Sequence, residues 1–244
     1  MEILPKSNGI FYPSSEKELS KMFKKFARKI VNFNSHLIIV PHAGYEFSGK
    51  IAFNTYQYLD RDVSNIIVIA PAIYKKVSGF VSCDVETFAT PLGSVKILPY
   101  NAEIRNDLFE IEPSFSVQLP FIKYFYPNAS VIPILYGCED YNNITELISS
   151  NIENSAIIIA SNLSRFIPEK ESLKLDAETI RKIANLQIED LDMELADGAI
   201  GICGAIEYAK SNGLKFVKTA HSNSAKFNED TSNVVGYGGW YLTQ

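Results

Sequence analysis

Several features that mark specialised proteins are scarce or missing in this 244-residue chain. Its three cysteines are far apart and form no CxxC pair, which excludes a disulfide framework and a zinc-finger pattern. No run approaches the roughly 20 apolar residues that a membrane helix needs, and the first residues lack the apolar segment of a signal peptide. We therefore expect a cytoplasmic protein with no membrane insertion.

Basic residues are also too few for a general nucleic-acid-binding surface. The chain has 23 Lys and Arg against 28 Asp and Glu, a formal net charge of -5, so we expect no nucleic acid partner. Hydrophobic residues make up 46% of the chain, which excludes a disordered or fibrous protein. The length suits one domain, 1–244, because no repeat or linker interrupts it.

The common catalytic and nucleotide-binding motifs are absent. The chain contains no GxGxxG, GxxxxGK[ST], HExxH or GxSxG pattern. This excludes nucleotide binding through the usual glycine-rich loops.

What is present is an alternation of short β-branched runs and helical segments, which is typical of βαβ units in a largely parallel sheet. Ser15 with Glu18 forms a capping box, followed by an apolar helical stripe: Leu19, Met22, Phe23, Phe26 and Ile30. Strands are predicted over 36–41, 65–71, 130–135, 155–161, 215–220 and 234–242, and helices over 48–59, 140–152, 176–195 and from 201 to a C-cap at Gly213. Residues 77–81 and 94–98 are a hairpin or two edge strands.

Ligands of open α/β sheets bind at the carboxyl ends of the strands. The loops after three of the predicted strands contain His42 and Tyr45, then Tyr74, then Asn162 and Arg165. If these strands are parallel, the five side chains face one crevice.

His42 is the strongest single candidate, because a histidine in a turn with glycine at a strand end can bind metal or act as a base. It can equally form a hydrogen bond that only holds the turn. We expect His36, at a strand start, to be structural and His221 to lie in a surface loop.

Cys203 lies between two glycines, Gly201 and Gly204, at a predicted helix start, where the helix dipole favours a thiolate. A thiolate would suit a metal ligand or a nucleophile, but free cysteine is also commonly a small buried residue. Cys83 and Cys138 have no such setting and are interpreted as packing residues. None of the three loops has Asp or Glu, so His42 and Cys203 would still need a third metal ligand.

Several motifs occur in an order and spacing that resemble one known family. They are Phe11-Tyr12-Pro13, Pro41-His42-Ala43-Gly44-Tyr45, Thr90-Pro91-Leu92-Gly93, Gln118-Leu119-Pro120-Phe121, Ile202-Cys203-Gly204 and Val234-Val235-Gly236-Tyr237. Over nearly its whole length the chain is similar to the Memo family, protein B of the AmmeMemoRadiSam grouping.

The resemblance implies a three-layer α/β/α fold with a mixed, mostly parallel sheet, similar to the class III extradiol dioxygenases of the LigB type. It also implies an iron or copper site made by two histidines and a cysteine. The first histidine corresponds to His42 and the cysteine to Cys203, whereas Ile73 stands where the second histidine belongs. Isoleucine has no atom that can bind metal.

Other polar positions of the family are also replaced. A histidine and a glutamate of the family correspond to Pro113 and Ser116, and an aspartate and a histidine correspond to Asn162 and Arg165. Asn162 cannot act as a carboxylate base, and Arg165 stays protonated, so it would repel a dication or bind an anion.

We therefore expect a divergent Memo-like protein that binds a ligand or partner without catalysis and without a cofactor. The expected binding residues are His42, Tyr45, Tyr74, Asn162, Arg165 and Cys203. One alternative is an iron- or copper-dependent oxidoreductase or dioxygenase that uses His42, Cys203 and an unforeseen third ligand. Another is a hydrolase or transferase with Cys203 as nucleophile and His42 as base. The family implies an AMMECR1-like protein or a radical S-adenosylmethionine enzyme as partner.

Overall fold

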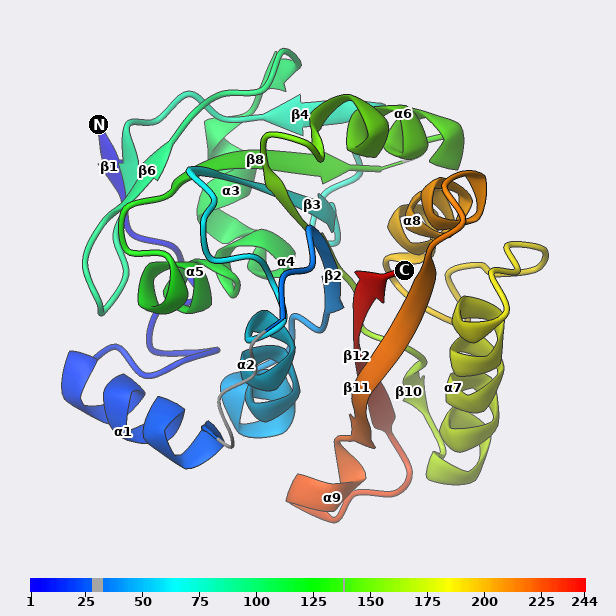
Figure 1. Ribbon diagram of the computed structural model, residues 1–244. Helices are drawn as coiled ribbons and strands as arrows, with labels where there is room; N and C mark the ends of the chain where they lie inside the picture. The colour runs from blue at the N-terminus through cyan, green and yellow to red at the C-terminus, as the bar shows by residue number, and fades with distance from the viewer. Residues whose placement is uncertain (28–32, 138) are drawn as a thin grey trace.

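The computed structural model describes residues 1–27, 33–137 and 139–244, and in this part of the chain twelve strands form one sheet (Figure 1). The strands are β1 (Glu2–Ile3), β2 (Leu37–Val40), β3 (Asn65–Pro71), β4 (Phe80–Ser82), β5 (Thr87–Phe88), β6 (Val95–Ile97), β7 (Glu103–Ile104), β8 (Ser130–Tyr136), β9 (Ala156–Ala160), β10 (Arg165–Ile167), β11 (Lys215–Asn223) and β12 (Val234–Thr243). The helices are α1 (Glu16–Phe26), α2 (Lys50–Tyr56), α3 (Asn106–Ile111), α4 (Pro113–Ser116), α5 (Leu119–Phe125), α6 (Tyr141–Asn151), α7 (Glu169–Ala184), α8 (Ala199–Ser211) and α9 (Ala225–Asn228), with a π-helical turn, η1, over Tyr45–Gly49.

The strand order is β1-β5-β6-β8-β3-β9-β2-β12-β10, and β11 pairs with β12. The central strands β8, β3, β9 and β2 run parallel to one another, whereas β12 runs antiparallel to β2 and β4 runs antiparallel to β8. This confirms the predicted mixed, mostly parallel sheet. β4 and β6 both pair with β8 and not with each other, so the hairpin is wrong. The edge-strand option is wrong as well, because β6 lies between β5 and β8, and β4 lies between β7 and β8.

Alternating side chains of the central strands build a core on each face of the sheet. In β2, Ile38 and Val40 join one hydrophobic cluster and Leu37 and Ile39 join the other. Residues of α1, α2 and α5 complete the first cluster, and residues of α6, α7 and α8 complete the second (Figure 1). The predicted three-layer α/β/α arrangement is therefore confirmed.

The Ser15 half of the predicted capping box is present at the start of α1. The Ser15 hydroxyl accepts the Glu18 backbone N–H at 3.2 Å, and Leu19 and Phe23 of the apolar stripe are fully buried. Ile30, the last residue of that predicted stripe, lies outside the described residues. Among the described helices, none is both long and apolar enough to cross a membrane.

The helix predicted over 176–195 is shifted in the structure. The observed helix α7 begins directly after Pro168, whose φ of -58° is already suited to a helix start. It ends at Ala184, before Leu186 and Asp190, which both adopt positive φ. Backbone conformations of this kind cannot continue a right-handed helix, so the apolar periodicity beyond residue 184 was misleading.

Helix α8 also begins earlier than predicted, at Ala199 instead of 201. Cys203 is therefore the fifth residue of the helix and lies beyond its first turn. Gly204 allows α8 to approach α6, because a Cβ there would lie 2.5 Å from the Cβ of Ile144. Gly213 follows the helix with φ of +65°, which confirms the predicted C-cap.

Candidate functional site

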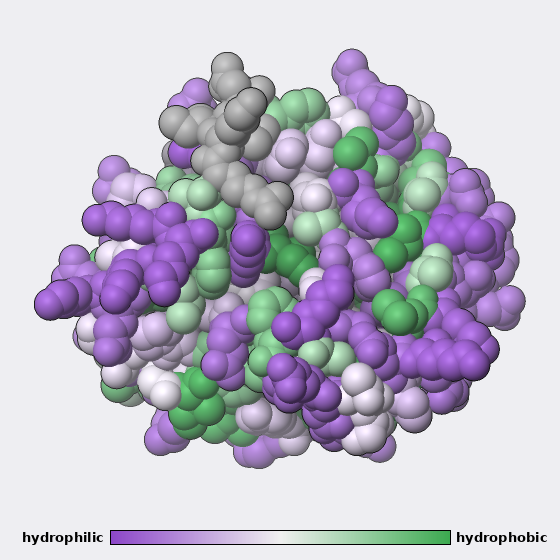
Figure 2. All heavy atoms as spheres, turned by 90° about the horizontal axis from the view of Figure 1, so that it is seen from below, coloured by the Kyte–Doolittle hydropathy of each residue, from purple (hydrophilic) through white to green (hydrophobic). Residues whose placement is uncertain are grey.

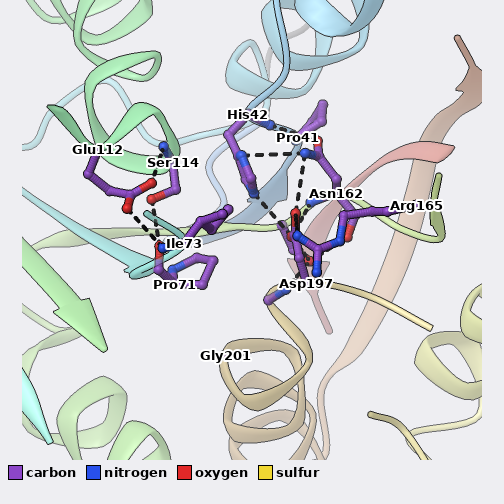
Figure 3. A network of polar contacts seen from close by, with 12 residues as sticks. Pro41, His42, Pro71, Ile73, Glu112, Ser114, Asn162, Arg165, Asp197 and Gly201 are labelled. Carbon is purple, nitrogen blue, oxygen red and sulfur yellow. Dashed lines mark hydrogen bonds and ion pairs between the residues drawn. The ribbon is translucent and has the colours of Figure 1, made fainter. Parts of the chain in front are cut away.

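Three loops meet at the carboxyl edge of the sheet. β2, β9 and β3 are adjacent and parallel, so the segments that follow them, which start at Pro41, Ser161 and Pro71, lie at one edge. Figure 3 shows the polar network formed there. The chain thus brings His42 and Asn162 together across 120 residues of sequence.

His42 and Asn162 bind each other through two contacts. The His42 backbone N–H donates to Asn162 Oδ1 at 3.1 Å, which turns Asn162 Nδ2 toward His42 Nδ1, 3.4 Å away. Since Nδ2 is a donor, this network assigns Nδ1 as the acceptor and places the ring hydrogen on Nε2. His42 is only 3% exposed, so the ring lies inside the protein.

Asp197 completes the network and was missed by the sequence analysis. Its Oδ1 lies 3.0 Å from His42 Nε2 and accepts the Asn162 backbone N–H at 2.8 Å. The Ser161 hydroxyl contacts the same oxygen at 3.4 Å. The carboxylate is therefore surrounded by donors in a buried place, which offsets much of the free-energy cost of burying its charge.

Gly198 explains how Asp197 comes so close to β9. A Cβ at residue 198 would lie 2.6 Å from the carbonyl oxygen of Ala160, so only glycine fits. The one signal in the sequence was an acidic residue directly before a glycine, a few residues ahead of the predicted helix start at Gly201. A negative charge at that place also interacts favourably with the dipole of α8.

Arg165 lies beside this network on β10. Its Nη1 is 3.6 Å from Asp197 Oδ2, which is an ion pair but too long for a hydrogen bond. The side chain is 26% exposed. The guanidinium charge of Arg165 therefore lies next to the opposite charge of the Asp197 carboxylate.

On the other side of Figure 3, Glu112 holds the loop after β3. Its Oε2 accepts the backbone N–H groups of Ile73 at 2.8 Å and Tyr74 at 3.0 Å, and its Oε1 accepts that of Ser114 at 3.2 Å. Glu112 is 2% exposed, whereas Ile73 and Tyr74 are 37% and 56% exposed. A buried carboxylate thus fixes a loop whose two apolar side chains face outward.

Tyr45 was expected to face the crevice, but the structure places it in the aromatic core. Its ring stacks on Phe121 with centroids 4.3 Å apart, and its hydroxyl donates to the carbonyl of Val117 at 2.7 Å. Burial raises the pKa of Tyr45 well above its ordinary value. From the start of the π-helical turn, the Tyr45 side chain thus packs against Phe121 of α5.

Cys203 is likewise a core residue of α8. The residue is 5% exposed, and its Sγ contacts the carbonyl oxygen of Leu191 at 3.7 Å as a donor. Burial raises the pKa of the Cys203 thiol to about 11, so the thiolate is disfavoured. The dipole argument failed because the helix starts four residues earlier than Cys203. Cys83 is buried, as predicted, and Cys138 lies outside the described residues.

The three positions that the family uses for metal do not fit iron or copper in this chain. Ile73 has no donor atom, the Nε2 hydrogen of His42 is directed at Asp197, and the thiol of Cys203 is protonated. Within the described ranges, no three His, Cys, Asp or Glu side chains are grouped as metal ligands.

The remaining two histidines lie elsewhere. His36 is half-exposed, with Nε2 3.8 Å from Asp60. His221 was expected in a surface loop, but it lies on β11 with Nε2 2.8 Å from the fully buried carboxylate of Asp176. Nothing in the sequence signalled that pairing, because 45 residues separate the two.

Comparison with known proteins agrees with this fold and these motifs. Residues 4–241 match the family model described as Memo-like protein. A MEMO1 family protein of Archaeoglobus fulgidus is 25% identical, covering 96% of this chain and 97% of the relative. MEMO1 family proteins of Methanococcus vannielii and Thermoplasma acidophilum are 28% and 27% identical, with at least 95% of each chain covered. The chain therefore belongs to the Memo family.

Proposed function

We propose that this protein is a Memo-family member that carries out no metal catalysis and binds an anionic group of a ligand or partner at Arg165. The proposal rests on which groups contact the two carboxylate oxygens of Asp197. Its Oδ1 is taken by His42 and Asn162, so the family's metal-binding histidine is already bound to a carboxylate of the chain itself. The neighbouring Arg165 is left with only a long contact.

Arg165 keeps donors for an external group. In the part of the chain that the structure describes, Asp197 is the one carboxylate within 4.0 Å of its guanidinium, and that contact spans 3.6 Å. A guanidinium presents a planar set of N–H donors that matches carboxylate or phosphate oxygens. Its partial exposure leaves these donors within reach of a ligand from solvent.

The loop held by Glu112 adds an apolar part to this edge. The exposed side chains of Ile73 and Tyr74 are fixed through their backbone N–H groups, so little conformational freedom is lost when a partner packs on them. A ligand or partner with an anionic group next to an apolar one matches this combination.

Metal loading tests the first half of the proposal. Wild type and a His42→Gln variant are incubated without oxygen with iron(II) or copper, desalted and measured by elemental analysis. We expect substoichiometric metal in both, since His42 Nε2 is bound to Asp197. One metal ion per chain in wild type that is lost in His42→Gln would overturn the proposal in favour of a metal-dependent oxidoreductase.

Anion binding tests the second half. Inorganic phosphate is titrated by calorimetry into wild type, Arg165→Met and a control, Lys75→Met, whose exposed ammonium lies beside Asp107. Loss of a charge-assisted contact should weaken binding about tenfold in Arg165→Met and leave the control near wild type. Equal affinity in all three proteins would contradict a role for Arg165.

The partners implied by the family are part of this proposal. An AMMECR1-like protein or a radical S-adenosylmethionine enzyme should co-purify with the tagged wild-type protein from its native host. Each identified partner is then titrated against purified wild type and Arg165→Met. If a partner binds wild type and Arg165→Met with equal affinity, it does not bind at the sheet edge that contains Arg165.

A further inference from the structure

Apart from the sheet edge, a cavity of about 550 Å³ lies between α2 and the β11–β12 ribbon. Its volume falls within the roughly 300–1,000 Å³ that is typical of small-molecule pockets. Figure 2 views the molecule from the side on which α2 and α9 lie in Figure 1, where apolar side chains are exposed between polar ones. This cavity is distinct from the edge that holds Arg165, because none of its lining residues belongs to the network of Figure 3.

Close packing between α2 and the ribbon forms one side of this cavity. The hydroxyl groups of Thr55 and Thr219 lie 2.6 Å apart and join the two elements. Gly239 permits that approach, because a Cβ there would lie 2.2 Å from Thr55 Oγ1. His221 also borders the cavity, but its Nε2 is directed at Asp176.

Aromatic rings provide the apolar walls. Phe47 and Phe227 meet edge to face, with centroids 6.1 Å apart, although they come from η1 and α9. Tyr58, which stacks on Tyr241 at 4.2 Å, lines another part. Phe227 is 50% exposed, so a flat apolar ligand that enters would cover surface that now faces water.

Two polar side chains, Lys50 at the start of α2 and Gln57 at its C-cap, determine which ligands the cavity favours. Lys50 is exposed and forms no ion pair with the described residues, and no acidic side chain lines the cavity. Gln57 is 6% exposed, and its Nε2 donates to Asn54 Oδ1 at 3.1 Å. Its amide oxygen accepts no hydrogen bond from the described residues. The cavity thus offers the Lys50 cation and the Gln57 acceptor between aromatic walls.

We propose that this cavity is a binding site for a small aromatic acid that also carries an N–H or O–H donor. The acid group pairs with Lys50, the donor binds the Gln57 oxygen, and the ring packs between Phe47 and Phe227. Such a site requires no metal and is independent of the function proposed for Arg165.

Indole-3-acetate is a suitable probe, since it combines a carboxylate, an aromatic ring and an N–H donor. Binding is measured by calorimetry and by saturation-transfer NMR on wild type, Lys50→Gln, Gln57→Leu and a control, Lys21→Gln, on the exposed face of α1. We expect saturable binding that weakens about tenfold in Lys50→Gln and severalfold in Gln57→Leu, the losses of one charged and one neutral hydrogen bond. The control should bind like wild type.

Tryptamine, which has the same ring but a cationic chain, serves as the matched probe and should bind much more weakly because Lys50 repels it. The proposal is overturned if indole-3-acetate shows no saturable binding to wild type. It is equally overturned if tryptamine binds as well, or if both folded variants keep wild-type affinity. Arg165→Met should leave indole-3-acetate binding unchanged, which separates this site from the anion site at the sheet edge.

Discussion

The carboxylate of Glu112 accepts the backbone N–H of Ile73 at 2.8 Å. The loop after β3 therefore keeps a defined shape, although the side chain of Ile73 cannot bind metal. Replacing Glu112 by Ala would leave this N–H and two others without an acceptor. We expect Glu112→Ala to lower the free energy of unfolding by about 3 kcal/mol or more, because three charged hydrogen bonds of about 1.5–3 kcal/mol each are lost and water replaces them only in part.

Urea denaturation measures this change, with Glu110→Ala as the control. Glu110 lies on α3, which ends directly before Glu112. It is partly exposed and paired with Lys6, so its loss should change the unfolding free energy by less than about 1 kcal/mol. A Glu112→Ala protein as stable as the control would contradict a structural role for the buried carboxylate.

Asp197 should be the most sensitive position of the polar network. Asp197→Ala leaves His42 and Arg165 without their shared partner, and removing one side of a buried ion pair typically costs about 3–5 kcal/mol. Asp197→Asn keeps an acceptor for His42 and should cost less. In phosphate titrations Asp197→Asn should bind more tightly than wild type, because Arg165 loses its internal anion. Weaker binding would argue against the function proposed for Arg165.

Cys203 should react slowly in the native protein. Burial raises its pKa from 9.0 to about 11, and only the thiolate attacks an alkylating reagent. Site-resolved mass spectrometry after iodoacetamide treatment at neutral pH should show Cys203 modified far more slowly than in urea. Rapid native alkylation that is slowed in His42→Ala would instead support the hydrolase alternative.

The same shift predicts how stability depends on pH. The raised pKa means that the folded state keeps the Cys203 proton while the unfolded state releases it. The stabilisation from this thiol is complete below pH 9 and is lost as the pH rises from about 9 to about 11. Urea midpoints should fall over this range, and less steeply in Cys203→Ala. Part of the fall should remain in the variant, since burial also raises the pKa of Cys83.

Phe166 adopts φ of +57° directly after Arg165, in a strand that shifts register at this point. A large side chain at positive φ is strained, and Phe166 is 69% exposed, so it gains little from burial. Phe166→Gly should raise the free energy of unfolding by about 1 kcal/mol, whereas Phe166→Ala, which keeps a Cβ, should not. A thermal unfolding series that places glycine below alanine would refute this account.

The local pattern of residues was enough to predict the layers of the fold. The runs at 37–40, 65–71 and 156–160 are β-branched on both faces, and such strands can only be buried between two helical layers. The N-cap at Ser15 and the C-cap at Gly213 could also be predicted, because caps depend on residues that are close in sequence. Even the shared edge of His42 and Asn162 followed from the parallel strands that precede them.

Tertiary structure alone decided what these residues contact. Asp197 reaches His42 from 155 residues away, Tyr45 turns into the aromatic core, and Cys203 is covered by the segment that contains Leu191. Each outcome depends on how a loop or helix packs across the sheet, which no short stretch of sequence encodes. The sequence by itself therefore determined which elements form and which family motifs remain, and the packing between distant segments determined that His42 binds a carboxylate of its own chain.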